Sequence, residues 1–191
     1  MKTIILTCAI SVMTLAAQKS IASGSVTGLY LTAEDYVHHK LSFSTNGSDK
    51  NHIRLNEFLQ SAKVVVMYNG KKQTFLKSRL FGYSRDNQDY RYFNNIAYRI
   101  IDTRDFLIYS APRLKQQAKW SKPENEYYFN RTDTTDIVPL SIKNLEAVYV
   151  SNTKFRYMIE SGFATDNSLT AYDTALKEYK VKYLYEQSSS N

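Results

Sequence analysis

Cysteine, histidine and glycine are scarce in this sequence, and each shortage excludes a class of chemistry. The 191 residues contain one cysteine, three histidines and six glycines. The cysteine, Cys8, lies in an amino-terminal segment that we expect to be removed. The remaining chain then has no disulfide, no thiolate nucleophile and no thiolate metal ligand. No glycines follow GxGxxG or GxxxxGK order, which excludes the common nucleotide-binding loops.

The histidines do not have the spacing of a metal site. His38 and His39 are adjacent, so they would point to opposite faces of an extended strand, and His52 lies far from both in sequence. No GxSxG elbow is present for a serine nucleophile. We therefore expect no metal, no cofactor and no recognisable catalytic residue, which favours a role other than an enzyme.

The first 22 residues are typical of a cleavable secretory signal peptide. Lys2 supplies the positive start, the segment from Ile4 to Ala17 is apolar, and Ala22 ends a group of small residues suited to cleavage. The apolar stretch is shorter than the roughly 20 residues that a membrane-spanning helix needs. We predict an exported protein, located in the periplasm or cell envelope or alternatively extracellular, with no transmembrane segment in the mature chain.

Residues 23–191 have the length of one domain, β-rich over 23–135 and helical over 140–187. Asn69-Gly70 lies between two strand-like runs and predicts a hairpin with a type I′ turn. Further runs are expected to form strands and to continue the hairpin as a six-strand meander. These expected strands cover residues 27–31, 41–45, 53–55, 63–68, 71–76, 80–84, 90–94, 97–101, 106–110 and 127–130.

The carboxy-terminal part changes to helical periodicity. Ser141 and Asn152 are expected to cap two helices, and a third, longer helix is expected from about Asn167, with an apolar stripe that reaches Tyr183. The polar stretch from Pro112 to Glu126 is expected to be a long loop. The predicted fold is α+β: an antiparallel β meander or small barrel followed by carboxy-terminal helices.

Positive charge is concentrated in the middle of the chain. Residues 63–122 contain 13 Lys and Arg but four Asp and Glu, a net charge of +9, whereas residues 123–191 have a net charge of −3. Such a segment attracts anions, although lysine and arginine also serve to keep strand edges soluble. We expect an anionic glycan, a lipid headgroup or an envelope protein as partner. We do not expect nucleic acid, because the sequence has no RNA-binding or zinc-finger motif.

Tyrosine alternates with arginine in the same segment, and this alternation suggests a binding surface. Tyrosine rings beside guanidinium groups can stack on sugars or hold anions, although sixteen tyrosines also suit a β core. The candidate ligand-binding residues are Tyr83, Arg85, Arg91, Tyr92, Arg99 and Trp120.

Several short motifs make the sequence resemble small exported proteins of unknown function from Bacteroidota. They are Gly28-Leu29-Tyr30-Leu31-Thr32 with Asp35-Tyr36, Phe81-Gly82-Tyr83, Tyr90-Arg91-Tyr92-Phe93, and Leu169 to Tyr172-Asp173 with Lys177 and Tyr179-Lys180-Val181. The resemblance implies the periplasm or envelope of a Gram-negative bacterium. It implies no activity and no site residues.

Our leading hypothesis is a non-enzymatic exported module that binds through its basic, tyrosine-rich surface. One alternative is a small hydrolase that pairs two carboxylates. Its candidate acids are Glu34, Asp35, Asp86, Asp89, Asp102 and Asp105, most of which fall in expected turns. A second alternative is a lipocalin-like carrier of an apolar ligand inside a barrel. The three hypotheses require a basic cleft, an acidic cleft and an apolar interior respectively.

The signal peptide gives the first testable prediction. We expect the secreted protein to begin at Ser23, because Ser20 and Ala22 are small residues at the two positions that a signal peptidase reads. Intact-mass spectrometry of the protein recovered outside the cytoplasm measures this directly. Recovery of a secreted chain that still begins at Met1 would overturn the prediction.

Overall fold

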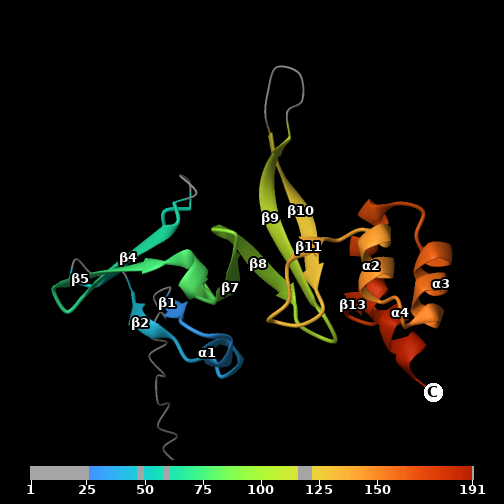
Figure 1. Cartoon of the computed structure of the whole chain (residues 1–191), viewed down its shortest axis with the longest axis horizontal. Helices are drawn as coiled ribbons and strands as arrows, with labels where there is room; N and C mark the ends of the chain where they lie inside the picture. The colour runs from blue at the N-terminus through green and yellow to red at the C-terminus, as the bar shows by residue number, and fades with distance from the viewer. Residues whose placement is uncertain (1–25, 47–49, 58–60, 116–121, 191) are drawn as a thin grey trace, which may run out of the picture.

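The computed structural model describes residues 26–46, 50–57, 61–115 and 122–190. A large antiparallel sheet forms the middle of the molecule, a small three-stranded sheet forms one end, and the carboxy-terminal helices form the other (Figure 1). The signal peptide predicted at residues 1–22 lies outside the described residues. Among the described residues, no helix is long and apolar enough to cross a bilayer.

The large sheet confirms the predicted meander with carboxy-terminal helices. Its strand order is β11-β10-β9-β8-β7-β6-β1-β2, and all its pairings are antiparallel. Within the described chain the sheet is open, with β2 and β11 at its edges, so it is the meander and not the barrel. The strands are β1 (Thr27–Tyr30), β2 (Ser42–Thr45), β6 (Gly82–Arg85), β7 (Gln88–Phe93), β8 (Ile96–Asp102), β9 (Leu107–Lys115), β10 (Lys122–Asn130) and β11 (Val138–Pro139). A short helix, α1 (Ala33–Val37), joins β1 to β2.

Two-residue turns with positive φ at both positions connect the hairpins. Asn69-Gly70 has φ values of 50° and 74°, Asp86-Asn87 has 55° and 58°, and Asn94-Asn95 has 49° and 65°. Asparagine, aspartate and glycine tolerate this left-handed backbone, and the resulting type I′ turn matches the twist of the flanking strands. The type I′ turn predicted at Asn69-Gly70 is confirmed, and the same kind of turn joins β6 to β7 and β7 to β8.

The first predicted hairpin does not belong to the meander, which corrects our six-strand interpretation. Its strands β4 (Lys63–Tyr68) and β5 (Lys71–Leu76) pair with β3 (His52–Arg54) in a separate sheet. A 3₁₀ turn over Lys77–Arg79 then turns the chain away, and β6 pairs with β1 instead. Val64 and Val66 of the small sheet are fully buried in a cluster that includes Leu29, Leu80, Tyr83 and Tyr92.

The stretch from Pro112 to Glu126 is mainly a hairpin, not the predicted long loop. β9 continues to Lys115 and pairs with β10 from Lys122 onward. The pairing of β9 with β8 stops at Ser110, so β9 has a free edge beyond that point. Pro112 is tolerated there because a free edge does not need its missing N–H donor.

Two helices begin directly after the capping residues that we predicted, Ser141 and Asn152. The Ser141 hydroxyl accepts from the Asn144 N–H at 3.1 Å before α2 (Ile142–Val148). The Asn152 side chain accepts from the Phe155 N–H at 3.0 Å before α3 (Thr153–Gly162). Each cap satisfies an N–H group that has no partner within its own helix.

The predicted third helix is wrong over its first half. The segment forms a 3₁₀ turn (Asp166–Thr170) and a small hairpin of β12 (Tyr172–Asp173) and β13 (Glu178–Tyr179), and only then α4 (Lys180–Ser189). The Asp173 carboxylate accepts from the N–H groups of Ala175 and Leu176, and Lys177 adopts a φ of 55°. This local turn competes with the helical pairing that the periodic pattern suggested.

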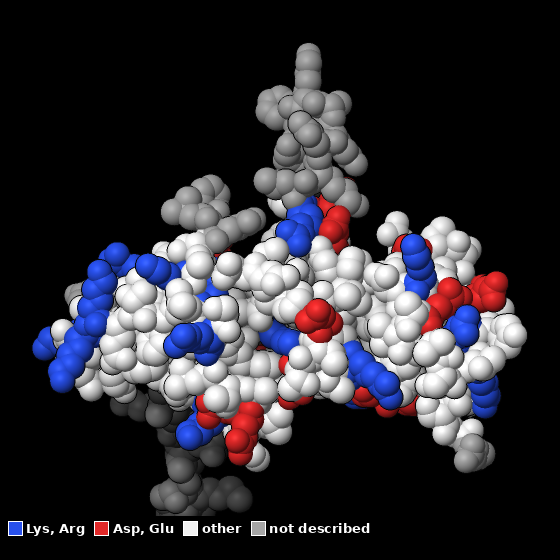
Figure 2. Space-filling model, viewed as in Figure 1, with Lys and Arg blue, Asp and Glu red and all other residues white. Residues whose placement is uncertain are grey.

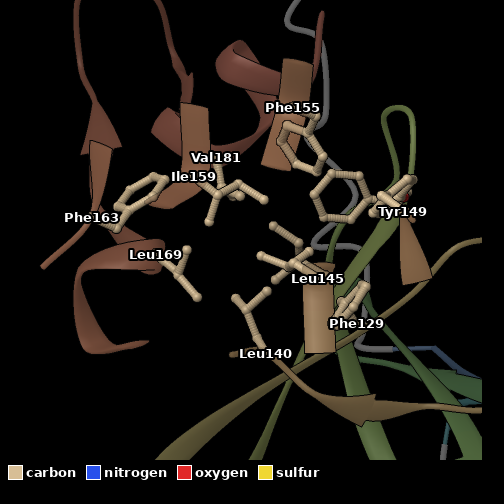
Figure 3. Close-up of a cluster of buried hydrophobic side chains, with 11 residues drawn as sticks. Phe129, Leu140, Leu145, Tyr149, Phe155, Ile159, Phe163, Leu169 and Val181 are labelled. Carbon is tan, nitrogen blue, oxygen red and sulfur yellow. The ribbon is translucent and has the colours of Figure 1, made fainter. Parts of the chain in front are cut away.

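The helices cover the end of the sheet formed by β9 and β10. Phe106, Ile108 and Phe129 of the sheet region pack with buried side chains from all three helices (Figure 3). Those helical and connecting residues are Leu140, Leu145, Tyr149, Phe155, Ile159, Phe163, Leu169 and Val181. Burying each such side chain contributes roughly 1.5–3 kcal/mol, so this cluster is the main attachment of the helices to the sheet.

A buried ammonium group fixes α4 to the turn between β8 and β9. The Lys182 side chain is fully buried and donates to the carbonyl oxygens of Arg104 and Phe106. Its Nζ also lies 3.6 Å from the Asp102 carboxylate. Arg104 joins the same group, at 3.0 Å from Asp102 and 3.4 Å from Glu178. Burial lowers the pKa of Lys182 to about 8.

Replacing Lys182 tests this attachment. We expect Lys182→Met to lower the free energy of unfolding by about 3 kcal/mol, because the buried Phe106 carbonyl and the Arg104 carbonyl lose their donor and Asp102 loses a partner. Lys180→Met, on the exposed side of the same helix, is the control and should cost less than about 1 kcal/mol. Urea unfolding measures both values, and equal losses would contradict the assignment.

The lowered pKa of Lys182 predicts that the stability of the protein depends on pH. The folded state holds the Lys182 proton less tightly than the unfolded chain does, because the pKa falls from its ordinary 10.5 to about 8. Between these values the unfolded chain binds more protons, so this group adds stability as pH rises. The stability difference between wild type and Lys182→Met should therefore widen from pH 8 to 10.5 and stay level below pH 8.

Candidate functional site

A surface cleft opens where β8 and β9 separate. Their ladder runs from Asp102↔Ile108 to Arg99↔Ser110, and beyond that pair the two strands diverge toward the long β9–β10 hairpin (Figure 1). The cleft between them has a volume of about 380 Å³, within the usual range of ligand sites. Its lining residues are Glu57, Lys77, Arg85, Tyr90, Asn95, Ile96, Ala97, Arg99, Ser110, Ala111, Pro112, Arg113 and Asn125.

The lining of this cleft is strongly basic. It contains four cationic side chains, Lys77, Arg85, Arg99 and Arg113, and a single carboxylate, Glu57. Glu57 is already engaged, because it accepts from the Tyr83 hydroxyl and lies 3.1 Å from Arg85. The cleft therefore keeps an excess of positive charge after its internal ion pair is counted.

Lys77 contributes a buried ammonium group to the cleft. Lys77 is 1% exposed, and its Nζ makes one long hydrogen bond to a described residue, the Asn95 carbonyl, at 3.5 Å. The Nζ also lies 5.2 Å from the centre of the Tyr92 ring. Burial lowers the pKa of Lys77, because a charged group in a desolvated position is disfavoured. An ammonium group can donate three hydrogen bonds, so this one has donors left over among the described residues.

Stacked tyrosine rings support the arginine at one side of the cleft. Tyr83 and Tyr90 are cross-strand partners whose rings stack at 4.6 Å with an interplanar angle of 4°. The Arg85 guanidinium lies 5.7 Å and 5.8 Å from the two ring centres. Burial, and then Glu57, raises the pKa of Tyr83. Glycine at position 82 permits the close strand approach, because a Cβ there would overlap the Tyr90 carbonyl oxygen.

The structure brings together some of the sequence-predicted site residues and separates others. Arg85 and Arg99 line the cleft, and Tyr83 lies beside it, bonded to Glu57. Tyr92 is buried beneath Lys77 and does not line the cleft. Trp120 lies outside the described residues.

Arg91 lies apart from the cleft, in a buried network of its own. It is 7% exposed and donates to the Tyr109 hydroxyl at 3.3 Å and the Thr135 carbonyl at 3.0 Å. Its guanidinium also lies 5.7 Å from the centre of the Phe81 ring. With these contacts, Arg91 ties β7 to β9 and to the connection after β10.

Three cleft residues were missed by the sequence reasoning. Lys77 follows a strand and resembles any other surface lysine, and only the 3₁₀ turn reveals its burial. Arg113 falls in the stretch that we expected to be a loop, and it donates from Nε to the Tyr128 hydroxyl at 2.9 Å. Glu57 is one isolated acid in the sequence, and its role depends on contact with two residues of β6.

The six acids of the hydrolase hypothesis do not line this cleft. Asp35 caps α1, Asp86 lies in a turn, and Asp89 accepts from the Tyr30 hydroxyl at 3.0 Å. Asp102 belongs to the Lys182 network. Across the described ranges, no three His, Asp or Glu side chains lie close enough to hold a metal ion. The open sheet also leaves the described strands without the barrel interior that the carrier hypothesis requires.

Comparison with known proteins adds no family to this description. No protein-family model, curated protein or solved structure matches the chain. The site must therefore be interpreted from its own geometry.

Two arginines from neighbouring strands give a prediction that separates structural from cleft roles. We expect Arg91→Gln to lower the free energy of unfolding by about 2–3 kcal/mol, because the Tyr109 hydroxyl and the Thr135 carbonyl lose a buried charged donor. Arg99→Gln should change it by less than about 0.5 kcal/mol, because Arg99 is exposed. Thermal or urea unfolding compares the two, and a larger loss for Arg99→Gln would reverse the assignment.

Proposed function

We propose that this protein is an exported, non-enzymatic binding module of the cell envelope, and that its basic cleft binds the acidic groups of a glycan. The observation that carries the proposal is the buried Lys77 ammonium, which makes one long hydrogen bond to the described residues and lines an open cleft. Burying a charge without full compensation is costly, and such groups concentrate where a ligand supplies the missing partner.

The charges around Lys77 favour an anion. Arg85 on β6 and Arg99 on β8 line the same cleft, with β7 between their strands, and Arg99 forms no hydrogen bond or ion pair with a described residue. Guanidinium groups bind carboxylate, sulfate or phosphate through paired N–H donors. An acidic ligand in this cleft would meet one buried ammonium and two guanidinium groups along the same lining.

The uncharged lining favours a sugar as the carrier of that anion. Tyr90 is half-buried and lines the cleft, so part of its ring is available to the face of a sugar. Asn95, Ser110 and Asn125 add neutral groups that can exchange hydrogen bonds with hydroxyls. The volume of about 380 Å³ suits one or two monosaccharide units.

Replacing Lys77 by methionine tests the proposal most directly. We expect Lys77→Met to weaken binding of a uronic-acid hexasaccharide roughly 10- to 100-fold, the value of one lost charged hydrogen bond. Stability should hold or rise, because an under-paired buried charge gives way to an apolar side chain of similar size. Isothermal titration calorimetry and urea unfolding give the two measurements.

Two comparisons make the result decisive. Lys143→Met removes an exposed lysine on α2 and should leave binding unchanged. Glu57→Gln removes the only carboxylate among the described lining residues and should tighten binding several-fold. If the wild type binds neutral and acidic hexasaccharides equally, or if Lys77→Met binds as the wild type does, the proposal fails.

A further inference from the structure

The small sheet of β3, β4 and β5 has two faces of opposite character. Its inner face packs Ile53, Val64, Val66 and Phe75 into the cluster around Tyr83. Its outer face is built from three cross-strand rows: Lys63 with Leu76, Arg54 with Val65 and Thr74, and His52 with Met67 and Lys72. The outer face is separate from the cleft, because none of these residues lines it.

Every row of the outer face contains one Lys or Arg and one apolar residue. Arg54, Lys63 and Lys72 are exposed, and none of their side chains forms an ion pair or hydrogen bond with another described residue. The only acid between residues 50 and 76 is Glu57, which is bound to Arg85. Lys and Arg side chains gather at this end of the molecule, whereas basic and acidic side chains lie together at the helical end (Figure 2).

The apolar residues of this face lie between the cations. Val65 and Met67 are half-buried in the central strand β4, and Leu76 is 41% exposed on the edge strand β5. A shallow depression of about 370 Å³ follows the face, lined by His52, Arg54, Asn56, Val65, Met67 and Lys72. The surface therefore offers cations and apolar side chains together, without a deep pocket for a small molecule.

We infer that this outer face docks on a membrane surface rich in anionic lipid. Arg54, Lys63 and Lys72 would contact headgroup phosphates, while Met67, Val65 and Leu76 would reach the boundary with the acyl chains. A soluble polyanion would use the three cations but would gain nothing from the apolar residues between them. The alternation of charge and apolar surface in every row thus favours a lipid surface.

Vesicle binding with two charge-matched variants tests the inference. The purified protein is sedimented with vesicles of phosphatidylcholine alone or mixed with phosphatidylglycerol, and binding is expected only with the mixture. Each cation near an anionic surface strengthens binding roughly fivefold, so Arg54→Gln/Lys63→Gln/Lys72→Gln should weaken it about a hundredfold. Lys40→Gln/Lys143→Gln/Lys177→Gln removes the same charge elsewhere and should change it only slightly. Equal losses for both variants would show general charge attraction and overturn the inference.

The apolar contribution separates lipid from other polyanions. Val65→Thr/Met67→Gln keeps the size and strand preference of both side chains, and it should weaken vesicle binding roughly tenfold. It should not change binding to a short duplex DNA, used here as a soluble polyanion. If it changes neither, the face is a polyanion site and the lipid inference is wrong. Lys77→Met should bind vesicles as the wild type does, so this result is independent of the cleft.

Discussion

The Lys182 network is the constraint on which the arrangement of the molecule depends. It closes one end of the β8–β9 ladder, because the ammonium binds two carbonyls of the connecting turn and lies beside Asp102 at the end of β8. The helical cluster then packs against the same turn through Phe106. With this end of the two strands held, they can separate at the other end without unravelling, and the cleft forms there.

Lys77 and Lys182 are similarly buried but differ in the acceptors around their ammonium groups. Both residues are at most 1% exposed. Lys182 has two carbonyl acceptors and lies 3.6 Å from a carboxylate, so all of its polar contacts are within the protein and its role is structural. Lys77 has one acceptor at 3.5 Å and lies against an opening. A buried ammonium with several acceptors inside the protein stabilises an attachment, whereas one with a single long hydrogen bond beside a cleft is a candidate to bind a ligand.

The features predicted correctly from the sequence are those that a few neighbouring residues determine. Asn69-Gly70 and Asn94-Asn95 give their turns because these residues accept positive φ, and Ser141 and Asn152 cap helices through their own side chains. The errors arise where distant contacts decide. The segment after Asn167 forms a hairpin before α4 because Asp173 caps a local turn and Glu178 is held by Arg104. Arg91 and Arg85 have similar sequence surroundings, yet only Arg91 meets the Thr135 carbonyl.

The same reasoning explains how the basic middle segment acquires more than one surface. In sequence, residues 63–122 form a single block of positive charge. Strand alternation and the 3₁₀ turn after β5 divide its cations, so that Lys77 enters the cleft while Lys63 and Lys72 lie on the outer face of the small sheet. Arg91 lies in the interior, where it binds the Tyr109 hydroxyl, and Arg104 belongs to the Lys182 network. Net charge alone predicts only a general attraction to anions, whereas the fold divides the cations between a cleft suited to a compact anionic group and an exposed face suited to an extended surface.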